Sequence, residues 1–273
     1  MKGKKYTDRE WLAKQFNEYK TPSLVSTMTG YPRTCVTRYA IKYGIYQKRF
    51  TRDKVNHVNE QYFNEIDTPE KAYFLGFIMA DGNMYLSNNN KYQFSIKIKS
   101  SDKDILLKFA KAIEFNLEKI TERNEERNGT ITTCAEIKIY NQAFCESLIA
   151  LGVVPRKTGK EYMPDIPKEL QKDFIRGYID GDGWIGKDNF QLGYCSSSYT
   201  MMEQITNYIK EAVNIDMKIK QQKTIYVAKI YAKKKVYHLL KHFYYDGCIS
   251  LDRKNNLAKQ KIIDIYNDLI GLL

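Results

Sequence analysis

Two aspartates occupy matching places in two similar nine-residue stretches, residues 74–82 and 175–183. Each stretch is mostly apolar, has a small residue at its third and seventh places, and ends in a carboxylate followed by glycine. The two carboxylates are Asp81 and Asp182, which lie 101 residues apart. Carboxylate oxygens are ligands that Mg²⁺ prefers in proteins. The repeat therefore predicts an internal duplication that brings two carboxylates to one metal-dependent site.

Two lysines repeat with nearly the same offset, because Lys157 and Lys254 are 97 residues apart and each follows an arginine. A basic pair in register with an acidic pair favours hydrolysis of a phosphodiester. A metal ion would activate water, and the lysines would stabilise the charge that builds on phosphorus. The alternative is that duplication preserved surface charge without a function. A third aspartate, Asp180, has Met79 as its counterpart, so we do not expect it to be essential to a symmetric mechanism.

The two stretches are expected to be helices that cross closely. Gly76 and Ala80 are four residues apart, as are Gly177 and Gly181, and residues at that spacing share one face of a helix. Small residues on that face let two helix backbones approach each other. We therefore expect this helix pair to form the seam between two halves of the chain.

The C-terminal end of such a helix pair is an unfavourable place for a carboxylate. Unpaired carbonyl groups and the helix dipole make the electrostatic potential negative there. Divalent cations would remove this conflict, and we expect Mg²⁺ to be held by Asp81 and Asp182 together with the backbone carbonyls of Ala80 and Gly181. The glycine that follows each aspartate is expected to adopt the left-handed conformation that ends many helices.

The remainder of each half also repeats. Residues 92–99 alternate apolar and polar side chains, which predicts a strand with one buried and one exposed face. The further segments expected are helix 100–115, strand 131–140 and helix 141–152 in the first half, and strand 190–194, helix 196–213, strand 224–231 and helix 233–245 in the second. Each half therefore reads helix, strand, strand, helix, strand, strand, helix, with some strands too weak to place.

These elements predict an α+β fold. It would consist of duplicated αββαββα lobes at residues 67–160 and 161–273, each with an antiparallel sheet. An all-α segment at residues 1–50 would precede the lobes, and residues 51–66 would be a linker.

The N-terminal segment is basic. Residues 1–54 hold 13 of the 44 lysine and arginine residues but only four of the 32 acidic ones, in a chain of net charge +12. A basic block beside a nearly neutral body favours a module that binds a polyanion, although a charge run can be only a solvated surface. Capping and turn signals predict three short helices, an arrangement that resembles a helix-turn-helix domain.

In a helix-turn-helix domain the third helix would enter the major groove of DNA. Any small three-helix bundle can show the same pattern, so this assignment is an expectation from shape and charge. The residues expected to contact bases or phosphates are Arg33, Thr34, Thr37, Arg38 and Lys42.

Composition limits the class of protein. Hydrophobic residues make up 43% of the 273 residues, which fits a globular chain, and no apolar run approaches the roughly 18 residues of a membrane span. We therefore expect no membrane partner.

The five cysteines are scattered and form no C-x-x-C pair, which favours reduced thiols in the cytoplasm. Abundant Lys, Asn, Ile and Tyr point to an AT-rich genome, so the expected location is a bacterial or phage-infected cell.

The two nine-residue stretches resemble the motifs of the LAGLIDADG homing endonucleases, whose name spells the pattern. The second copy keeps the final Asp-Gly-Asp-Gly, and the first has Met79 at the sixth place but keeps the acid at the eighth. The resemblance covers about residues 67–260. It implies a monomer with internal pseudo-two-fold symmetry, whose sheets lie on double-stranded DNA and which cuts both strands with a divalent metal. The basic N-terminal segment is not part of the minimal fold.

By motif position, the resemblance implies that Asp81 and Asp182 are metal ligands and that Lys157 and Lys254 are the basic pair of the active site. It also implies that the exposed strand faces read bases. The residues at such positions are Gln93, Ser95, Lys97 and Lys99 in the first half, and Gln191 and Gly193 in the second. Because the strand near Gly193 is poor in positive charge, the contacts there are expected to be hydroxyl groups, from Ser196, Ser197 and Ser198. A register shift of one residue would exchange the two faces.

The expected function is that of a site-specific double-strand DNA endonuclease, a homing endonuclease that acts in intron homing. The alternative is a nucleic-acid binder that does not cut, either a maturase that binds intron RNA or a transcriptional regulator on the same scaffold. The retained acids argue against a regulator, because idle buried carboxylates at a helix end are costly. They leave a maturase open.

Overall fold

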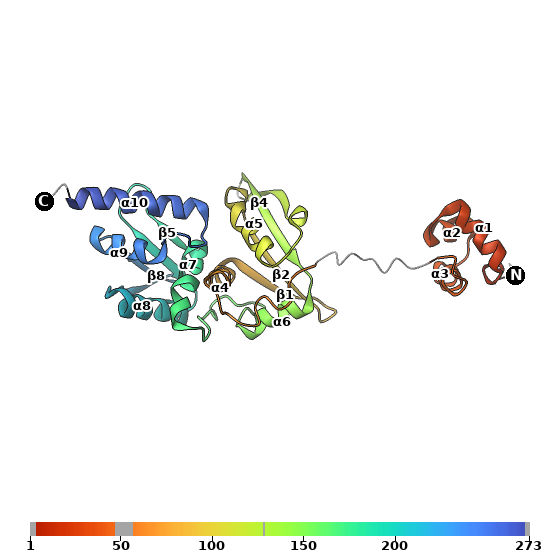
Figure 1. Cartoon of the computed structure of the whole chain (residues 1–273), viewed down its shortest axis with the longest axis horizontal. Helices are drawn as coiled ribbons and strands as arrows, with labels where there is room; N and C mark the ends of the chain where they lie inside the picture. Colours follow the sequence, from red (N-terminus) through yellow and green to blue (C-terminus); the bar gives the residue numbers. More distant parts are fainter. Residues whose placement is uncertain (1–3, 47–56, 128, 271–273) are drawn as a thin grey trace. The chain divides into compact units, whose positions relative to one another are not determined.

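The computed structural model describes residues 4–46, 57–127 and 129–270. The chain divides into two compact units, Met1–Val55 and Asn56–Leu273 (Figure 1). The smaller unit consists of three helices, α1 (Arg9–Tyr19), α2 (Pro22–Thr29) and α3 (Arg33–Lys42), after a short 3-10 turn. Thr21 caps α2 through its side chain, and Gly30 ends α2 in the left-handed conformation. The core of this unit is Leu12, Phe16, Val25, Val36 and Ala40.

The larger unit contains the two predicted lobes. Lobe 1 is built from α4 (Pro69–Asp81), β1 (Gly82–Leu86), β2 (Tyr92–Lys99), α5 (Lys103–Ala112), β3 (Thr121–Arg127), β4 (Thr130–Ile139) and α6 (Gln142–Ala150). Lobe 2 is built from α7 (Gln171–Asp182), β5 (Gly183–Ile185), β6 (Leu192–Ser196), α8 (Tyr199–Val213), β7 (Ile219–Gln222), β8 (Ile225–Ile230) and α9 (Lys233–Phe243), followed by α10 (Asp252–Ile270). The predicted αββαββα order is confirmed in both lobes.

The two sheets have the same topology. Each has four antiparallel strands, in the order β1-β2-β4-β3 in lobe 1 and β5-β6-β8-β7 in lobe 2. In lobe 1 the pairs Met84↔Phe94 and Ile96↔Ile137 place buried side chains on one face, which α5 and α6 cover. Helix α8 covers the corresponding face in lobe 2. The opposite face of each sheet therefore remains available to a partner.

Helices α4 and α7 form the seam between the lobes and lie side by side in Figure 1, with one sheet on each side. A Cβ at Gly76 would lie 1.9 Å from the carbonyl oxygen of Phe174, and a Cβ at Gly177 would lie 2.0 Å from that of Tyr73. Real Cβ atoms do not approach a backbone oxygen this closely. The two helices are thus in backbone contact at these glycines, as the small-residue pattern predicted.

The glycines after the two aspartates serve a different purpose from the predicted one. Gly82 has φ −72° and Gly183 has φ −108°, so neither adopts the left-handed conformation, and each begins a strand directly. A Cβ at Gly82 would lie 2.5 Å from the carbonyl oxygen of Ile78, and one at Gly183 would lie 2.6 Å from that of Ile179. Glycine is required here because the chain turns back closely on its own helix.

The predicted linker was too long. Residues 57–66 belong to lobe 1, because Val58, Tyr62, Phe63 and Ile66 are buried in the same core as the helix pair. The remaining predicted linker residues, 51–56, lie outside the described part of the chain, as do residues 47–50 of the predicted N-terminal domain.

The second-half strand predicted at 190–194 is β6, which lies two residues later at Leu192–Ser196. The alternation of Leu192, Tyr194 and Ser196 toward the core sets this register, and Ser198 instead of Ser196 caps the next helix through its hydroxyl. Within the described ranges, no helix is both long and apolar enough to cross a membrane.

Candidate active site

The two aspartates of the repeated motif meet at the C-terminal ends of the seam helices. Asp81 is the last residue of α4 and Asp182 is the last residue of α7. The helices remain close to this point, because a Cβ at Gly181 would lie 2.4 Å from the Cβ of Ala80 and 3.1 Å from Oδ2 of Asp81. The absence of a side chain at Gly181 therefore makes room for the Asp81 carboxylate beside α7.

Both carboxylates are in an unfavourable environment. Burial and the nearby charge of Asp182 raise the pKa of Asp81 to about 6, against the partial compensation of two lysines. Burial also raises the pKa of Asp182, and the carboxylate of Glu161 acts in the same direction. A charged group that is costly to keep buried is a common property of functional sites.

Each predicted lysine reaches the end of one seam helix. Lys157 Nζ donates to the carbonyl oxygens of Met79 at 2.7 Å and Ala80 at 3.1 Å. Lys254 Nζ donates to three carbonyl oxygens, those of Ile179 at 2.7 Å, Asp180 at 2.7 Å and Gly183 at 2.6 Å. The lysines thus satisfy the carbonyl groups that a helix end leaves without partners.

The lysines are buried, whereas the two acids are half-buried. Lys157 is 8% exposed and Lys254 is 4% exposed, and burial lowers the pKa of both. The opposing influence on the pKa of Lys157 comes from Glu161 and from the two aspartates. Two acids and two bases therefore share one partly desolvated centre, in which each charge depends on the others.

The donor set fits a divalent cation shared with a substrate. Asp81 and Asp182 offer carboxylate oxygens, and a cation between them would relieve the repulsion that raises the pKa of Asp81. The predicted contribution of the Ala80 carbonyl stays a prediction; that oxygen accepts one hydrogen bond, from the Lys157 ammonium at 3.1 Å, and keeps a second lone pair. The Gly181 carbonyl also stays a prediction. Within the described ranges there is no group of three or more His, Cys, Asp or Glu side chains that could hold a metal ion. Water and phosphate oxygens would have to complete the coordination.

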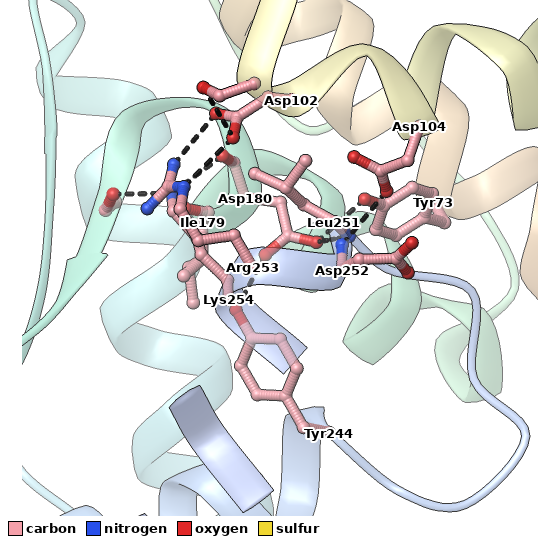
Figure 2. Close-up of polar contacts among 12 residues, drawn as sticks. Tyr73, Asp102, Asp104, Ile179, Asp180, Tyr244, Leu251, Asp252, Arg253 and Lys254 are labelled. Carbon is pink, nitrogen blue, oxygen red and sulfur yellow. Dashed lines mark hydrogen bonds and ion pairs between the residues drawn. The ribbon is translucent and has the colours of Figure 1, made fainter. Parts of the chain in front are cut away.

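Asp180 has a structural role that the sequence did not reveal. Its carboxylate is 2% exposed and accepts from the hydroxyls of Tyr73 and Tyr244, both at 2.7 Å, and from the backbone N–H of Leu251 at 2.8 Å (Figure 2). Tyr73 lies on α4 of lobe 1, whereas the other partners lie in lobe 2. Asp180 therefore ties the two lobes together behind the active-site acids.

An ion pair beside the site was also missed. Arg253 donates from Nε and Nη2 to the two carboxylate oxygens of Asp102, at 3.0 and 2.9 Å, and so fixes the residue next to Lys254 (Figure 2). The Arg-Lys repeat was a signal for Arg253, but nothing in the sequence placed Asp102 opposite it. Glu161, which faces Asp182, gave no signal either.

The first predicted DNA-contacting strand has the expected orientation. Register pairs Ser95 with Lys138 and Lys97 with Glu136, on the face opposite the core. Lys97 and Lys99 are exposed, whereas Ser95 is 7% exposed and offers little surface. Lys97 forms an ion pair with Glu125 at 2.8 Å, and Lys138 forms one with Glu136 at 3.0 Å. Part of the positive charge on this face is therefore already neutralised. The fourth predicted residue, Gln93, is half-buried on the same face.

The second predicted strand needed correction. Ser196 is 4% and Ser198 is 3% exposed, because the Ser196 hydroxyl accepts from Ser198 N–H and the Ser198 hydroxyl donates to the Glu161 carbonyl. These two hydroxyls organise the start of α8 and are not available to DNA. Gln191 and Ser197 are half-buried and stay predictions. Gly193 is covered by the indole of Trp184, since a Cβ there would lie 2.3 Å from that ring.

Positive charge on the second sheet comes from other strands than the predicted one. Lys229 of β8 pairs with Gly193, and Lys220 of β7 pairs with Val227, so both lysines lie on the face away from the core. With Lys218 and Lys235 they line one cavity at the edge of the sheet. Strands β7 and β8 alternate weakly in sequence, which hid this basic face.

The third helix of the N-terminal unit groups four of its five predicted contact residues. Arg33, Thr34, Thr37 and Arg38, with Ile41, line a hollow on α3. Lys42 does not line this hollow, but its Nζ is 5.7 Å from the centre of the Tyr39 ring, which the Arg38 guanidinium also approaches, at 5.3 Å. The role of these residues in DNA binding stays a prediction.

Two family models match the two lobes separately. Residues 169–244 match the LAGLIDADG-like domain, and residues 70–139 match the WhiA LAGLIDADG-like domain. The boundaries agree with the structure, because each match begins near the start of a seam helix, α7 in lobe 2 and α4 in lobe 1.

Individual relatives are distant. The chain is 24% identical over 200 residues to the DNA-directed RNA polymerase subunit Rpo1C of Methanocaldococcus jannaschii, a match that covers 72% of this chain but only 21% of that protein. It is 24% identical over 216 residues to an uncharacterised protein of the same organism, covering 77% of this chain and 71% of the relative. The chain thus spans about a fifth of the polymerase subunit, whose activity is not transferable to it.

Solved structures show similar folds at low identity. A variant of the homing endonuclease I-DmoI is 16% identical, covers 71% of this chain and 96% of its own, and has a TM-score of 0.47. The N-terminal LAGLIDADG domain of DUF199/WhiA is 14% identical, covers 74% and 96%, and has a TM-score of 0.43. With a family domain in each lobe and the duplicated αββαββα fold around one helix seam, the chain is a member of the LAGLIDADG family.

Proposed function

We propose that this protein is a site-specific DNA endonuclease that hydrolyses both strands of a duplex with a divalent cation, Mg²⁺ being the expected one. The observation that carries the proposal is the meeting of Asp81 and Asp182 at the ends of α4 and α7, in an environment that raises the pKa of both. Keeping two such acids together destabilises the folded chain unless a ligand compensates them. A divalent cation would supply activation of water and stabilisation of the leaving oxygen.

In the proposed reaction, the oxygen of a water molecule bonds to phosphorus, the bond from phosphorus to one sugar oxygen breaks, and a proton from the water ends on that sugar oxygen. Asp81 and Asp182 would hold the cation and orient the attacking water. Lys157 keeps one ammonium proton without a partner among the described residues, and that proton can reach a phosphate oxygen. All three N–H groups of the Lys254 ammonium donate hydrogen bonds to carbonyl oxygens, so we propose that Lys254 acts by positioning the end of α7.

The sheet faces away from the two cores would hold the duplex, as a single-chain monomer with internal pseudo-symmetry. Lys97 and Lys99 in lobe 1 and Lys220 and Lys229 in lobe 2 supply cations for phosphates on these faces. The net charge of +12 supports a polyanionic partner. Homing of an intron as the biological role also belongs to this proposal.

The test is cleavage of a plasmid in Mg²⁺ or in EDTA. The plasmid carries the two genomic segments that flank the coding sequence, joined directly so that the coding sequence is absent. We expect linear product only with Mg²⁺. Asp81→Asn and Asp182→Asn should each slow double-strand cleavage at least about 100-fold, the loss typical of removing one preorganised electrostatic group. Binding of the same DNA in EDTA should persist. Asp188→Asn, at an exposed aspartate of lobe 2, is the matched control and should cut like wild type. Undiminished cutting by either active-site variant would remove the acids from the mechanism.

We also propose that the N-terminal unit is a helix-turn-helix domain that adds affinity for DNA. Support comes from its basic composition and from the hollow lined by Arg33, Thr34, Thr37 and Arg38. In the full chain, Arg33→Gln combined with Arg38→Gln should reduce the slope of log affinity against log salt by about 2, because each lost phosphate contact removes roughly 0.9. An unchanged slope would refute phosphate contacts by these two arginines.

A second candidate is a nucleic-acid binder that does not cut, including a maturase that binds intron RNA. It is favoured by the match of lobe 1 to the WhiA LAGLIDADG-like model and by the commitment of Lys254 to backbone carbonyls. In that case the protein should bind the plasmid locus or an intron transcript with the same affinity in Mg²⁺ and EDTA and leave both DNA strands intact. Metal-dependent cutting that requires Asp81 would exclude it.

A further inference from the structure

The two basic ends of the active site are chemically unequal. We define pole 1 as Arg156 and Lys157 and pole 2 as Arg253 and Lys254, which occupy equivalent positions 97 residues apart. Each lysine reaches the end of one seam helix. A symmetric reaction on two strands would need equivalent groups at both poles, so a difference between them bears directly on the order of the two cuts.

Pole 2 has no donor to spare at its lysine. An ammonium group has three protons, and Lys254 donates to three carbonyl oxygens at 2.6–2.7 Å. The guanidinium of Arg253 is engaged with both oxygens of Asp102 (Figure 2). For Lys254 to contact a phosphate, a buried hydrogen bond must first break, and a buried carbonyl must lose its partner.

Pole 1 retains free donors. Lys157 donates to two carbonyl oxygens, and the longer of these bonds is 3.1 Å. Arg156 is exposed and has no hydrogen bond or ion pair with any residue that the structure describes. Its backbone has φ +55°, a conformation that is uncommon for a residue other than glycine and that often occurs at functional sites. Pole 1 can therefore accept a phosphate without breaking an existing contact.

The difference has a clear origin in the helix that each pole meets. Pole 2 meets the start of α5, where Asp102 pairs with Arg253 and Lys108 donates to the carbonyl of Ser250 at 2.8 Å. In lobe 2 the residues 96 positions later are neutral: Ser198 stands in the place of Asp102 and Gln204 in the place of Lys108. Ser198 and Gln204 bond the backbone of Glu161 and Met163, and so leave Arg156 without a carboxylate.

We infer that the centre treats its two target phosphates unequally: pole 1 contacts its phosphate directly through Arg156 and Lys157, and the strand at pole 1 is cut first. The inference rests on the proposed endonuclease function. The chemistry at each strand is the hydrolysis described above, with water oxygen bonding to phosphorus and one sugar oxygen leaving with a proton. A direct cation at the phosphate stabilises the charge that develops there. Arg156 can supply one with no carboxylate beside it among the described residues, whereas the charge of Arg253 is already partly neutralised by Asp102.

The test follows the two strands separately. The probe is the supercoiled plasmid that carries the joined flanking DNA, with each strand labelled at the locus, in Mg²⁺. Wild type should accumulate nicked circles, with one strand cut at least about tenfold faster than the other, a ratio that corresponds to a modest difference in barrier. Arg156→Gln should slow the faster strand about tenfold and the slower strand less than twofold, with an unchanged melting temperature.

Arg253→Gln is the matched variant at the equivalent position. It should lower the melting temperature by about 2–4 °C, as expected for the loss of about 1 kcal/mol in a domain of this size, and keep the wild-type order of cutting. Equal rates for the two strands in wild type, or equal slowing of both strands by Arg156→Gln, would overturn the inference while leaving the endonuclease in place. If wild type cuts neither strand in Mg²⁺, the proposed function fails and the inference fails with it.

Discussion

The two lobes have the same order of elements and the same sheet topology, yet they distribute charge differently. In lobe 1 the exposed sheet face carries lysines that are paired with Glu125 and Glu136. In lobe 2 the lysines of β7 and β8 form no ion pair within the described part of the chain. The two basic poles show the opposite contrast. The ammonium that keeps an N–H group without a partner among the described residues is that of Lys157, in the segment that ends lobe 1.

This contrast shows which features a duplication must keep and which it can lose. Backbone contact at the helix seam is symmetric, because Gly76 and Gly177 meet the opposite helix in the same way. The polar groups around the seam are not symmetric, since Asp180 has Met79 as its counterpart. Where two helix backbones touch, both helices must carry a small residue. A buried hydrogen-bond network can connect the two lobes from one side alone, so its residues need not be repeated.

The largest expected effect tests the symmetry of the seam. Gly76→Ala and Gly177→Ala should each destabilise the larger unit by at least about 4 kcal/mol, at the upper end for single substitutions, because the new Cβ would displace a backbone carbonyl. Urea denaturation followed by circular dichroism measures this. Lys111→Ala, at an exposed site of α5, is the control and should stay within about 0.5 kcal/mol. A mild cost at one glycine only would show that the two helices do not cross symmetrically.

The next effect tests the asymmetry behind the acids. Asp180→Asn should cost about 2–4 kcal/mol, because the substitution replaces one oxygen that accepts from buried donors with an NH2 group that cannot accept. Met79→Leu at the equivalent position conserves volume and should cost less than about 1.5 kcal/mol. Thermal unfolding of both variants gives the comparison. Similar costs at the two positions would mean that the network around Asp180 contributes little.

The third effect is a gain in stability at the active site. Because the pKa of Asp81 is about 6 in the folded chain and 3.8 without burial, the folded chain holds a proton that the unfolded chain has released between these pH values. Its contribution to stability is full below pH 3.8 and is lost as the pH rises through 6. Asp81→Asn should therefore be more stable than wild type by about 2 kcal/mol at pH 8 in EDTA.

At pH 4 the same variant should match wild type, because the wild-type carboxyl is then largely protonated. Unfolding in urea at both pH values measures the difference, and Asp188→Asn should show no such pH dependence. Equal stability of wild type and Asp81→Asn at pH 8 would contradict the view that the site opposes folding until a ligand binds.

The smallest effect compares the two sheet faces. In the full chain, Lys229→Gln should reduce the slope of log affinity against log salt by about 0.9, the value for one phosphate contact, on a random duplex. Lys97→Gln should reduce it by less, because Lys97 is already paired with Glu125. Fluorescence anisotropy between about 50 and about 300 mM salt measures both slopes, because screening of exposed charges strengthens over this interval. A larger change for Lys97→Gln would reverse the assignment of the two faces.

Much of the fold was predictable from local patterns. The strand β2 and the caps at Thr21 and Asn141 follow from alternation and from side-chain oxygens that accept backbone N–H groups. The helix seam follows from the spacing of its glycines. The register of β6 was not predictable, because Gly193 and Ser196 carry little hydrophobic contrast between the two faces.

By itself, the sequence determined the duplication, the helix seam and the two aspartates at its end, because close backbone approach permits only small residues and the motif repeats them. Only the tertiary structure decided how the charges around those acids are used. The three carbonyl partners of Lys254 and the pairing of Arg253 with Asp102 depend on groups that are distant in sequence, as does the lack of a partner for Arg156 among the described residues. A hydrogen bond requires two groups to lie within a few ångströms, and the neighbouring sequence does not determine which distant groups meet. Equivalent residues of a repeat can therefore have different partners and different roles.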